Sequence, residues 1–348
     1  MEVCGSMRLI WLVVLLMVPG SPLRAEWEVV NVEGREYVTL ASLAANFGLA
    51  PAAASAAEFT LTGTGGNLVV KAGSRQAIIS GVRHWLSYPT QIQGGAGLVS
   101  LVDVEKTVKP ALQPLSVKGL RPVATVVLDP GHGGYDRGAR SAFGVEKDFA
   151  LDVVFRVRKR LEKAGLKVVQ TRMGDSFIPL EARPAAARKY PNSIFVSIHF
   201  NSGDSNPAAN GLEIFAIAPL GAPPTGQGAP QARDRNREPG HALEPVNFLL
   251  ANTIYHSLMG KTASFDRGVK RARFVVLKEA TAPAVLIEGG FLTNAAEAAR
   301  IATPAWRDAY ADAIVAGILE YKKLAEQGIP PKRVAEYGKS GTAGFVPE

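Results

Sequence analysis

The stretch VVLDPGHGGYDRGARSAFGVEKD, residues 126–148, indicates both the fold class and the place where chemistry would occur. It opens with an apolar run typical of a buried strand and then breaks into a loop that contains five glycines. The loop presents His132, and Glu146 follows just before a helical pattern; packing requires neither side chain. A strand, a glycine loop and a helix in succession predict an α/β domain.

The same alternation of strands and helices continues to residue 327. Helical segments are expected at 148–165 and 303–328, the first with an apolar stripe and a stop at Gly165. We therefore predict a three-layer αβα catalytic domain with a mostly parallel sheet over residues 124–327, followed by a flexible tail, 328–348. Apolar strands are expected at 124–129, 167–172, 193–199, 211–217, 273–277 and 284–290.

Residues 1–25 have the pattern of an export signal. Arg8 precedes a ten-residue apolar run, and a Pro-Gly break leads to Ala25, a suitable cleavage residue. The run is short for a membrane span, so a cleaved signal peptide is favoured over a retained anchor, and no other segment reaches transmembrane length. We expect an exported protein, periplasmic or in the cell envelope, with no membrane span in the mature chain. Cys4 is the only cysteine and would be removed with the signal peptide, so thiolate metal ligands and disulfides are excluded in the mature chain.

The chain is basic, with 39 Lys and Arg against 31 Asp and Glu, for a net charge of +8. A basic protein can bind nucleic acid, but no basic run with interleaved aromatic residues occurs, so we expect no nucleic-acid partner. An anionic polymer outside the cell suits the charge and the export signal equally well.

Residues 26–110 predict a small α+β accessory domain ahead of the catalytic domain. A turn is expected at Glu33-Gly34, short strands separated by Gly or Ser follow, and a closing helix is expected with Asp103 as its cap. His84, alone in one of these strands, is expected to fill space rather than bind a metal. Prolines mark residues 111–123 as an extended linker.

Three strands of the catalytic domain end in residues that packing would not choose. His132 follows one strand, His199 ends a second and Glu288 ends a third, and in open α/β sheets such residues share one crevice. With Glu146, the two histidines are the ligand set of a catalytic Zn²⁺, and Glu288 is left as general base. The structural alternatives are a plain loop histidine and a buried ion pair. The chain has no HExxH or GxSxG motif.

The set of motifs resembles the zinc-dependent N-acetylmuramoyl-L-alanine amidases of bacterial cell walls. The resemblance implies cleavage of peptidoglycan between N-acetylmuramic acid and L-alanine, with His132, Glu146 and His199 as zinc ligands and Glu288 as the catalytic glutamate. Asn201 matches the family pattern SIHxN and is a candidate for ligand orientation or substrate contact. The motifs that carry the resemblance are VVLDPGHGG, VEKDFALDV, VSIHFNS and RGVKRARFVVLKEATAPAVLIEGGFLTN.

Residues 26–110 are similar to the copper amine oxidase N-terminal-like domain, on the strength of GREYVTLASLAANFGL and LVSLVDVEK. This resemblance implies no copper chemistry. It leaves open a wall-binding module, a docking point for an activator, and a passive spacer.

An insertion at residues 218–245 is rich in Pro and Gly, which makes it a poor plug helix and predicts a mobile, basic lid near the substrate groove. Its Glu238, His241 and Glu244 are expected to be surface loop residues. Two rival functions stay open: a zinc carboxypeptidase acting on the peptide stem, which would need an arginine for the terminal carboxylate, and a wall-binding module without activity.

Overall fold

The predicted catalytic domain is built on six strands, and four of their five pairings are parallel. The computed structural model describes residues 27–54 and 57–327, so the predicted signal peptide and tail lie outside the described residues. The antiparallel pairing joins β17 (Ala284–Phe291) and β15 (Leu212–Ile217), and the predicted mostly parallel sheet is confirmed. In spatial order the strands are β13 (Lys167–Gln170), β10 (Thr125–Pro130), β14 (Ser193–Asn201), β17 (Ala284–Phe291), β15 (Leu212–Ile217) and β16 (Asp266–Ala272).

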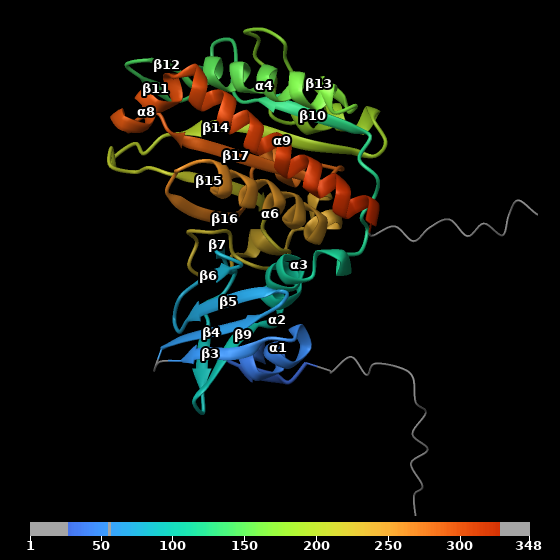
Figure 1. The fold of residues 1–348 in the computed structure, drawn as a ribbon, viewed down its shortest axis with the longest axis vertical. Helices are drawn as coiled ribbons and strands as arrows, with labels where there is room; N and C mark the ends of the chain where they lie inside the picture. Colours follow the sequence, from blue (N-terminus) through green and yellow to red (C-terminus); the bar gives the residue numbers. More distant parts are fainter. Residues whose placement is uncertain (1–26, 55–56, 328–348) are drawn as a thin grey trace, which may run out of the picture.

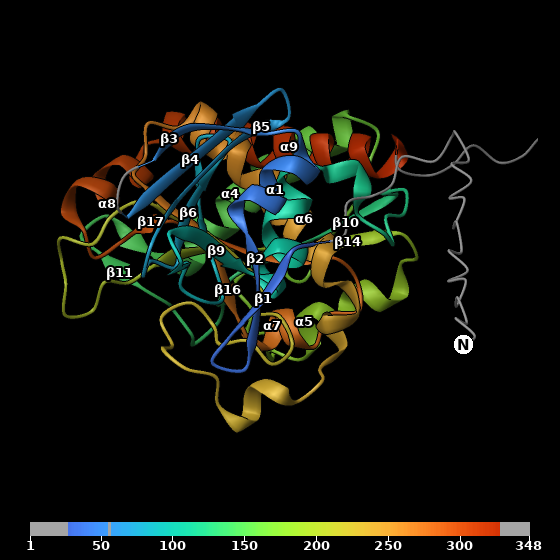
Figure 2. The same cartoon turned by 90° about the horizontal axis from the view of Figure 1, so that it is seen from below.

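Helices cover both faces of this sheet, which confirms the three layers. Helices α4 (Glu146–Lys163), α6 (Glu244–Lys261) and α9 (Pro304–Gln327) lie on one face, and α5 (Ala182–Ala185) and α7 (Val275–Lys278) lie on the other (Figures 1 and 2). A separate apolar core fills each interface. Each fully buried side chain of the α4 stripe contributes about 1.5–3 kcal/mol. The stripe consists of Phe149, Val153, Val157 and Leu161.

The remaining elements are short and lie around the sheet. Helix α8 (Ala295–Ala302) follows β17, and the hairpin β11 (Arg140–Ser141) and β12 (Gly144–Val145) precedes α4. Single helical turns are formed by Pro114–Ser116, Ala186–Lys189, Ala232–Arg235 and Pro239–Leu243.

The N-terminal part has its own apolar core and two sets of strands, shown in blue to teal in Figure 1. Helix α1 (Leu40–Phe47) ends at Gly48, whose left-handed conformation closes it as glycine allows. One antiparallel sheet has the order β1 (Val29–Val32), β2 (Arg35–Thr39), β9 (Ala96–Ser100), β8 (Gln91–Gln93). The meander consists of β3 (Ala50–Ala54), β4 (Glu58–Gly63), β5 (Gly66–Lys71), β6 (Gln76–Ile79) and β7 (Val82–Trp85).

The meander continues the catalytic sheet. Strand β7 pairs with β16, with His84 opposite Val269, so one sheet of eleven strands runs through both parts. Arg271 of β16 is fully buried and donates hydrogen bonds to the carbonyl of Lys106 and the hydroxyl of Thr107. The start of the predicted linker is helical, since α2 (Leu101–Asp103) leads through a π-helical segment (Val104–Val108) into α3 (Lys109–Leu112). The described residues of the N-terminal part are therefore attached to the catalytic part by a strand pairing and buried polar contacts.

Two local predictions were wrong. The apolar run 273–277 forms the short helix α7 rather than a strand, and the strand is the polar segment before it, β16. Ser100, not Asp103, caps the helix that closes the N-terminal part. The Asp103 carboxylate is buried and accepts hydrogen bonds from the backbone of Ser87 and Tyr88 instead.

Candidate active site

Three neighbouring strands carry the side chains of the candidate site at matching positions. His199 on β14 and Glu288 on β17 are register partners, and Glu213 on β15 is the partner of Glu288 from the other side. Directly opposed residues project from the same face of a sheet, so these three side chains form a row across it. His132 follows β10, the strand beyond β14, and reaches the row from its loop.

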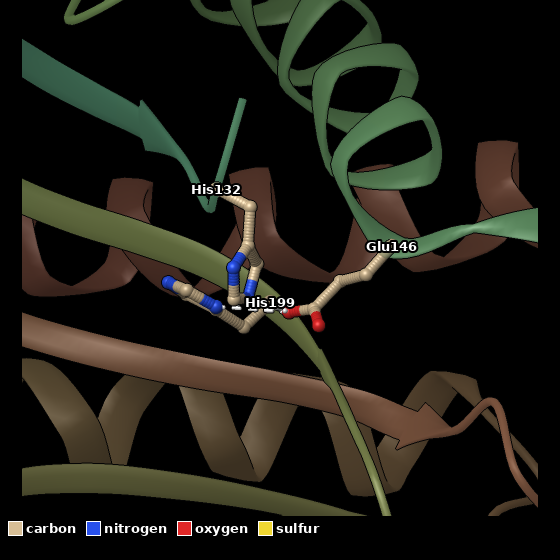
Figure 3. Close-up of side chains that lie close together, drawn as sticks. All are labelled: His132, Glu146 and His199. Atoms are coloured by element: carbon tan, nitrogen blue, oxygen red, sulfur yellow. Dashed lines mark hydrogen bonds and ion pairs between the residues drawn. The ribbon is translucent and has the colours of Figure 1, made fainter. Parts of the chain in front are cut away.

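The three predicted metal ligands converge from a loop, a helix start and a strand (Figure 3). One donor atom from each of His132, Glu146 and His199 lies within 4.8 Å of the others. Oε1 of Glu146 is 3.0 Å from Nε2 of His132 and 2.9 Å from Nδ1 of His199. Two imidazole nitrogens and one carboxylate oxygen around one point fit a catalytic zinc ion, which uses three protein ligands and leaves one position open.

Neighbouring groups hold two of these ligands in place. Nδ1 of His132 is 2.8 Å from a carboxylate oxygen of Asp136, which turns Nε2 of the same ring toward Glu146. Glu146 accepts backbone hydrogen bonds from Phe200 at Oε1 and from Ala139 at Oε2. Such outer contacts fix the tautomer and orientation of metal-binding side chains.

The glycines beside the ligands are needed for space. A Cβ atom at Gly131 would lie 2.4–2.7 Å from three ring atoms of His199, and one at Gly138 would lie 2.4 Å from Oε2 of Glu146. His132 itself has φ of 57°, a left-handed conformation that costs a non-glycine residue energy and occurs more often at functional sites. The glycine-rich loop therefore brings backbone and imidazole rings closer than other residues would allow.

The charges of the cluster favour an ionised Glu146. Burial alone would raise the pKa of this carboxyl group, but the hydrogen bonds from His132 and His199 outweigh burial and hold the pKa well below its usual range. Burial lowers the pKa of His132, and the contacts with Glu146 and Asp136 outweigh it and raise that pKa overall. Glu146 thus presents a carboxylate anion to the point where the donors meet.

Glu288, the predicted base, lies in the same row of side chains, and one of its carboxyl oxygens has no hydrogen-bond partner among the described residues. That oxygen, Oε2, is buried. Burial, and then the negative charges of Glu146 and Glu213, raise the pKa of Glu288 well above its usual range, against the opposing effect of Lys270. A buried carboxyl oxygen without a partner is costly to maintain, and such a group in a native structure is often explained by a functional role.

The sequence reasoning missed the support on the far side of this row. Glu213 is buried and its carboxylate pairs with Lys270 and, at 2.6 Å, with Nε of Arg267. Asn201 donates a hydrogen bond of 2.7 Å to the same carboxylate. The available signal was a glutamate inside the apolar strand GLEIFAI, but the partners came from β16, which was not predicted as a strand.

A cavity of about 520 Å³ opens over the cluster. Its wall includes all five predicted site residues, but no residue of the insertion 218–245. Those five residues are His132, Glu146, His199, Asn201 and Glu288.

The insertion is folded back and bonded, contrary to the predicted mobile lid. Arg273 donates hydrogen bonds to the carbonyls of Pro219 and Ala222, and Arg75 donates a hydrogen bond of 2.6 Å to the carbonyl of Gln227. Its Pro and Gly content prevents an α-helix, but it leaves carbonyls that long-range arginines bind. Two of the residues predicted at the surface, His241 and Glu244, are buried.

Comparison with known proteins agrees with this geometry. The family model described as N-acetylmuramoyl-L-alanine amidase matches residues 126–320, more than half of the chain. The chain belongs to this amidase family. The matched range contains every residue of the site, while the resemblance of residues 26–110 to the copper amine oxidase N-terminal-like domain stays a prediction.

Curated relatives of this amidase carry the same name. The chain is 34% identical over 218 residues to N-acetylmuramoyl-L-alanine amidase AmiA of Escherichia coli K12, a match that covers 56% of this chain and 75% of AmiA. It is 34% identical over 197 residues to LytC of Bacillus subtilis 168, covering 57% of this chain and 35% of LytC. Among solved structures, AmiC2 of Nostoc punctiforme is 33% identical, with 57% of this chain and 97% of that chain covered and a TM-score of 0.48.

Within the part of the amidase that the structure describes, no helix combines the length and apolar character needed to cross a membrane.

Proposed function

We propose that the chain is an exported zinc amidase that cleaves the bond between the lactyl group of N-acetylmuramic acid and L-alanine in peptidoglycan. His132, Glu146 and His199 hold the ion, and Glu288 is the general base. One observation carries the proposal: the three-donor cluster and Glu288, a carboxyl group outside the ligand set, line the same cavity.

When bound, the zinc ion supplies a Lewis acid that polarises the amide carbonyl and lowers the pKa of water to about 7. Glu288, which lines the cavity beside the cluster, takes a proton from the attacking water. The same carboxyl group then returns the proton to the alanine nitrogen as the amide bond breaks. Asn201 acts indirectly, since it holds Glu213, the register partner of Glu288.

The carboxypeptidase alternative lacks a suitable arginine. Arg183 and Arg273 line the cavity. Arg183 is buried and donates to Asp129 and to three backbone carbonyls. Arg273 pairs with Asp234 and donates from Nη2 to three backbone carbonyls of the insertion. The Nε and Nη1 atoms of Arg273 have no hydrogen-bond partner among the described residues, but they are buried and so are not presented to the terminal carboxylate of a peptide. An activator that docks on residues 26–110 also stays a prediction.

Metal content and turnover, measured on the same variants, test the assignment. Glu288→Gln should keep zinc at one ion per chain while the release of stem peptide falls by at least a thousandfold, because only the proton acceptor is lost. His199→Ala should lose both zinc and activity. Glu162→Gln, on the outer surface of α4, is the control. Near-wild-type turnover by Glu288→Gln would refute the role of this carboxylate.

A further inference from the structure

Two aromatic rings stand exposed beside the candidate site without a role in the cluster. Tyr135 is 79% exposed and Phe177 is 38% exposed, and their rings stack with centroids 4.4 Å apart and planes 26° apart. We call this pair the aromatic platform. Phe177 covers one face of the Tyr135 ring, so the exposed surface includes the other face. Exposed apolar groups that gather at a cavity mark binding surfaces.

The platform is fixed rather than free to turn away. The backbone N–H of Gly134 donates a hydrogen bond of 2.7 Å to the carboxylate of Asp175. Lys147 donates hydrogen bonds to both the carbonyl of Gly134 and the carboxylate of Asp175. A Cβ atom at Gly134 would lie 2.9 Å from the backbone nitrogen of Phe177. The two loops that carry the rings are therefore held together by several bonds, and the platform is formed before any ligand arrives.

The loops that carry the platform also contribute residues to the wall of the cavity over the metal cluster. Asp136, the residue after Tyr135, bonds His132 and lines the cavity. Leu180, which is 50% exposed and lies three residues after Phe177, lines it as well.

The chemistry of the rings selects a sugar. The negatively polarised face of an aromatic ring attracts weakly positive C–H groups, and the flat side of a pyranose presents several of them. In muramic acid the ring carbon C3 is three bonds, about 4 Å, from the amide carbonyl carbon, so the sugar must lie beside the reacting atoms. On the basis of the proposed function, we propose that Tyr135 and Phe177 receive the glycan strand of peptidoglycan next to the metal cluster.

Binding of peptide-free glycan strands tests the platform without turnover. Strands of alternating N-acetylglucosamine and N-acetylmuramic acid, freed of stems, are titrated against the zinc-loaded protein by calorimetry. Tyr135→Ala should weaken binding by about tenfold, whereas Tyr135→Phe keeps the ring and stays within about threefold of wild type. Phe155→Ala, which removes an exposed aromatic ring from α4, should leave binding unchanged.

Two outcomes would overturn the platform: equal affinity of Tyr135→Ala and wild type, or no binding of the strands by wild type. Stem release from intact peptidoglycan is measured in parallel. If stem peptides are released but strand binding is the same in wild type and Tyr135→Ala, the platform is wrong and the proposed reaction stands. Strand binding that depends on Tyr135, with no stem released, overturns the proposed reaction and leaves the saccharide site in place.

Discussion

Replacement of His84 by glutamine should change how the stability of the protein depends on acid. His84 is fully buried where β7 meets the catalytic sheet, with Nε2 2.8 Å from Oδ1 of Asn252 and Nδ1 2.9 Å from the carbonyl of Val82. Burial is the main cause that lowers the pKa of this imidazole to about 4, and His256 nearby adds to it. The folded chain thus keeps His84 neutral at a pH where the unfolded chain protonates it.

The sign and size follow from the two pKa values. An unfolded histidine binds its proton near pH 6.5, so between about pH 6.5 and 4 the unfolded state holds more protons and stability rises with pH. The contribution of His84 is complete above pH 6.5 and is lost as the pH falls through about 4. The gap between the two pKa values corresponds to about 3 kcal/mol of unfolding free energy.

Urea unfolding of wild type and His84→Gln, each in chelator from about pH 7.5 to about pH 4, measures this term. Other titrating groups act equally on both proteins, so the difference between their unfolding free energies isolates His84. That difference should fall by about 3 kcal/mol across the range. A difference that does not change with pH would refute a neutral, buried His84 at the junction.

Three further substitutions probe the surroundings of the site. Gly131→Ala should weaken zinc binding at least tenfold by equilibrium dialysis, because the new Cβ meets the ring of His199; unchanged affinity would contradict the packing. Glu213→Gln leaves two cations without their carboxylate and should lower the unfolding free energy by about 3–5 kcal/mol, and a loss below about 1 kcal/mol would show the pairing to be weak. Arg75→Ala removes the hydrogen bonds that Arg75 donates to carbonyls of the insertion, so proteolysis within residues 218–245 should become faster. An unchanged cleavage rate would show that other contacts keep the insertion in place.

The strands that carry the ligands could be predicted because each contains a short, nearly continuous apolar run in its own sequence. β10, β14 and β17 are largely apolar on both faces, as buried parallel strands are, and a polar residue stands out just past the end of β10 and within β14 and β17. His132, His199 and Glu288 were found by that contrast alone. Their mutual approach follows from the sheet edge that parallel strands share.

The rest depended on contacts that local sequence does not record. Strand β16 reads DRGVKRA, without an apolar period, and becomes a strand because β15 and β7 pair with it on either side. The insertion looked mobile by composition, yet Arg75 binds it from 148–152 residues away. The role of Glu213 likewise required the register that places it opposite Glu288.

Mass analysis of the products from purified peptidoglycan tests the central assignment most directly. Zinc-loaded wild type should release intact stem peptides that begin with a free L-alanine amine, and Glu288→Gln should release none. Products shortened at the carboxyl end of the stem, or equal release by both proteins, would contradict the assigned bond or the assigned base.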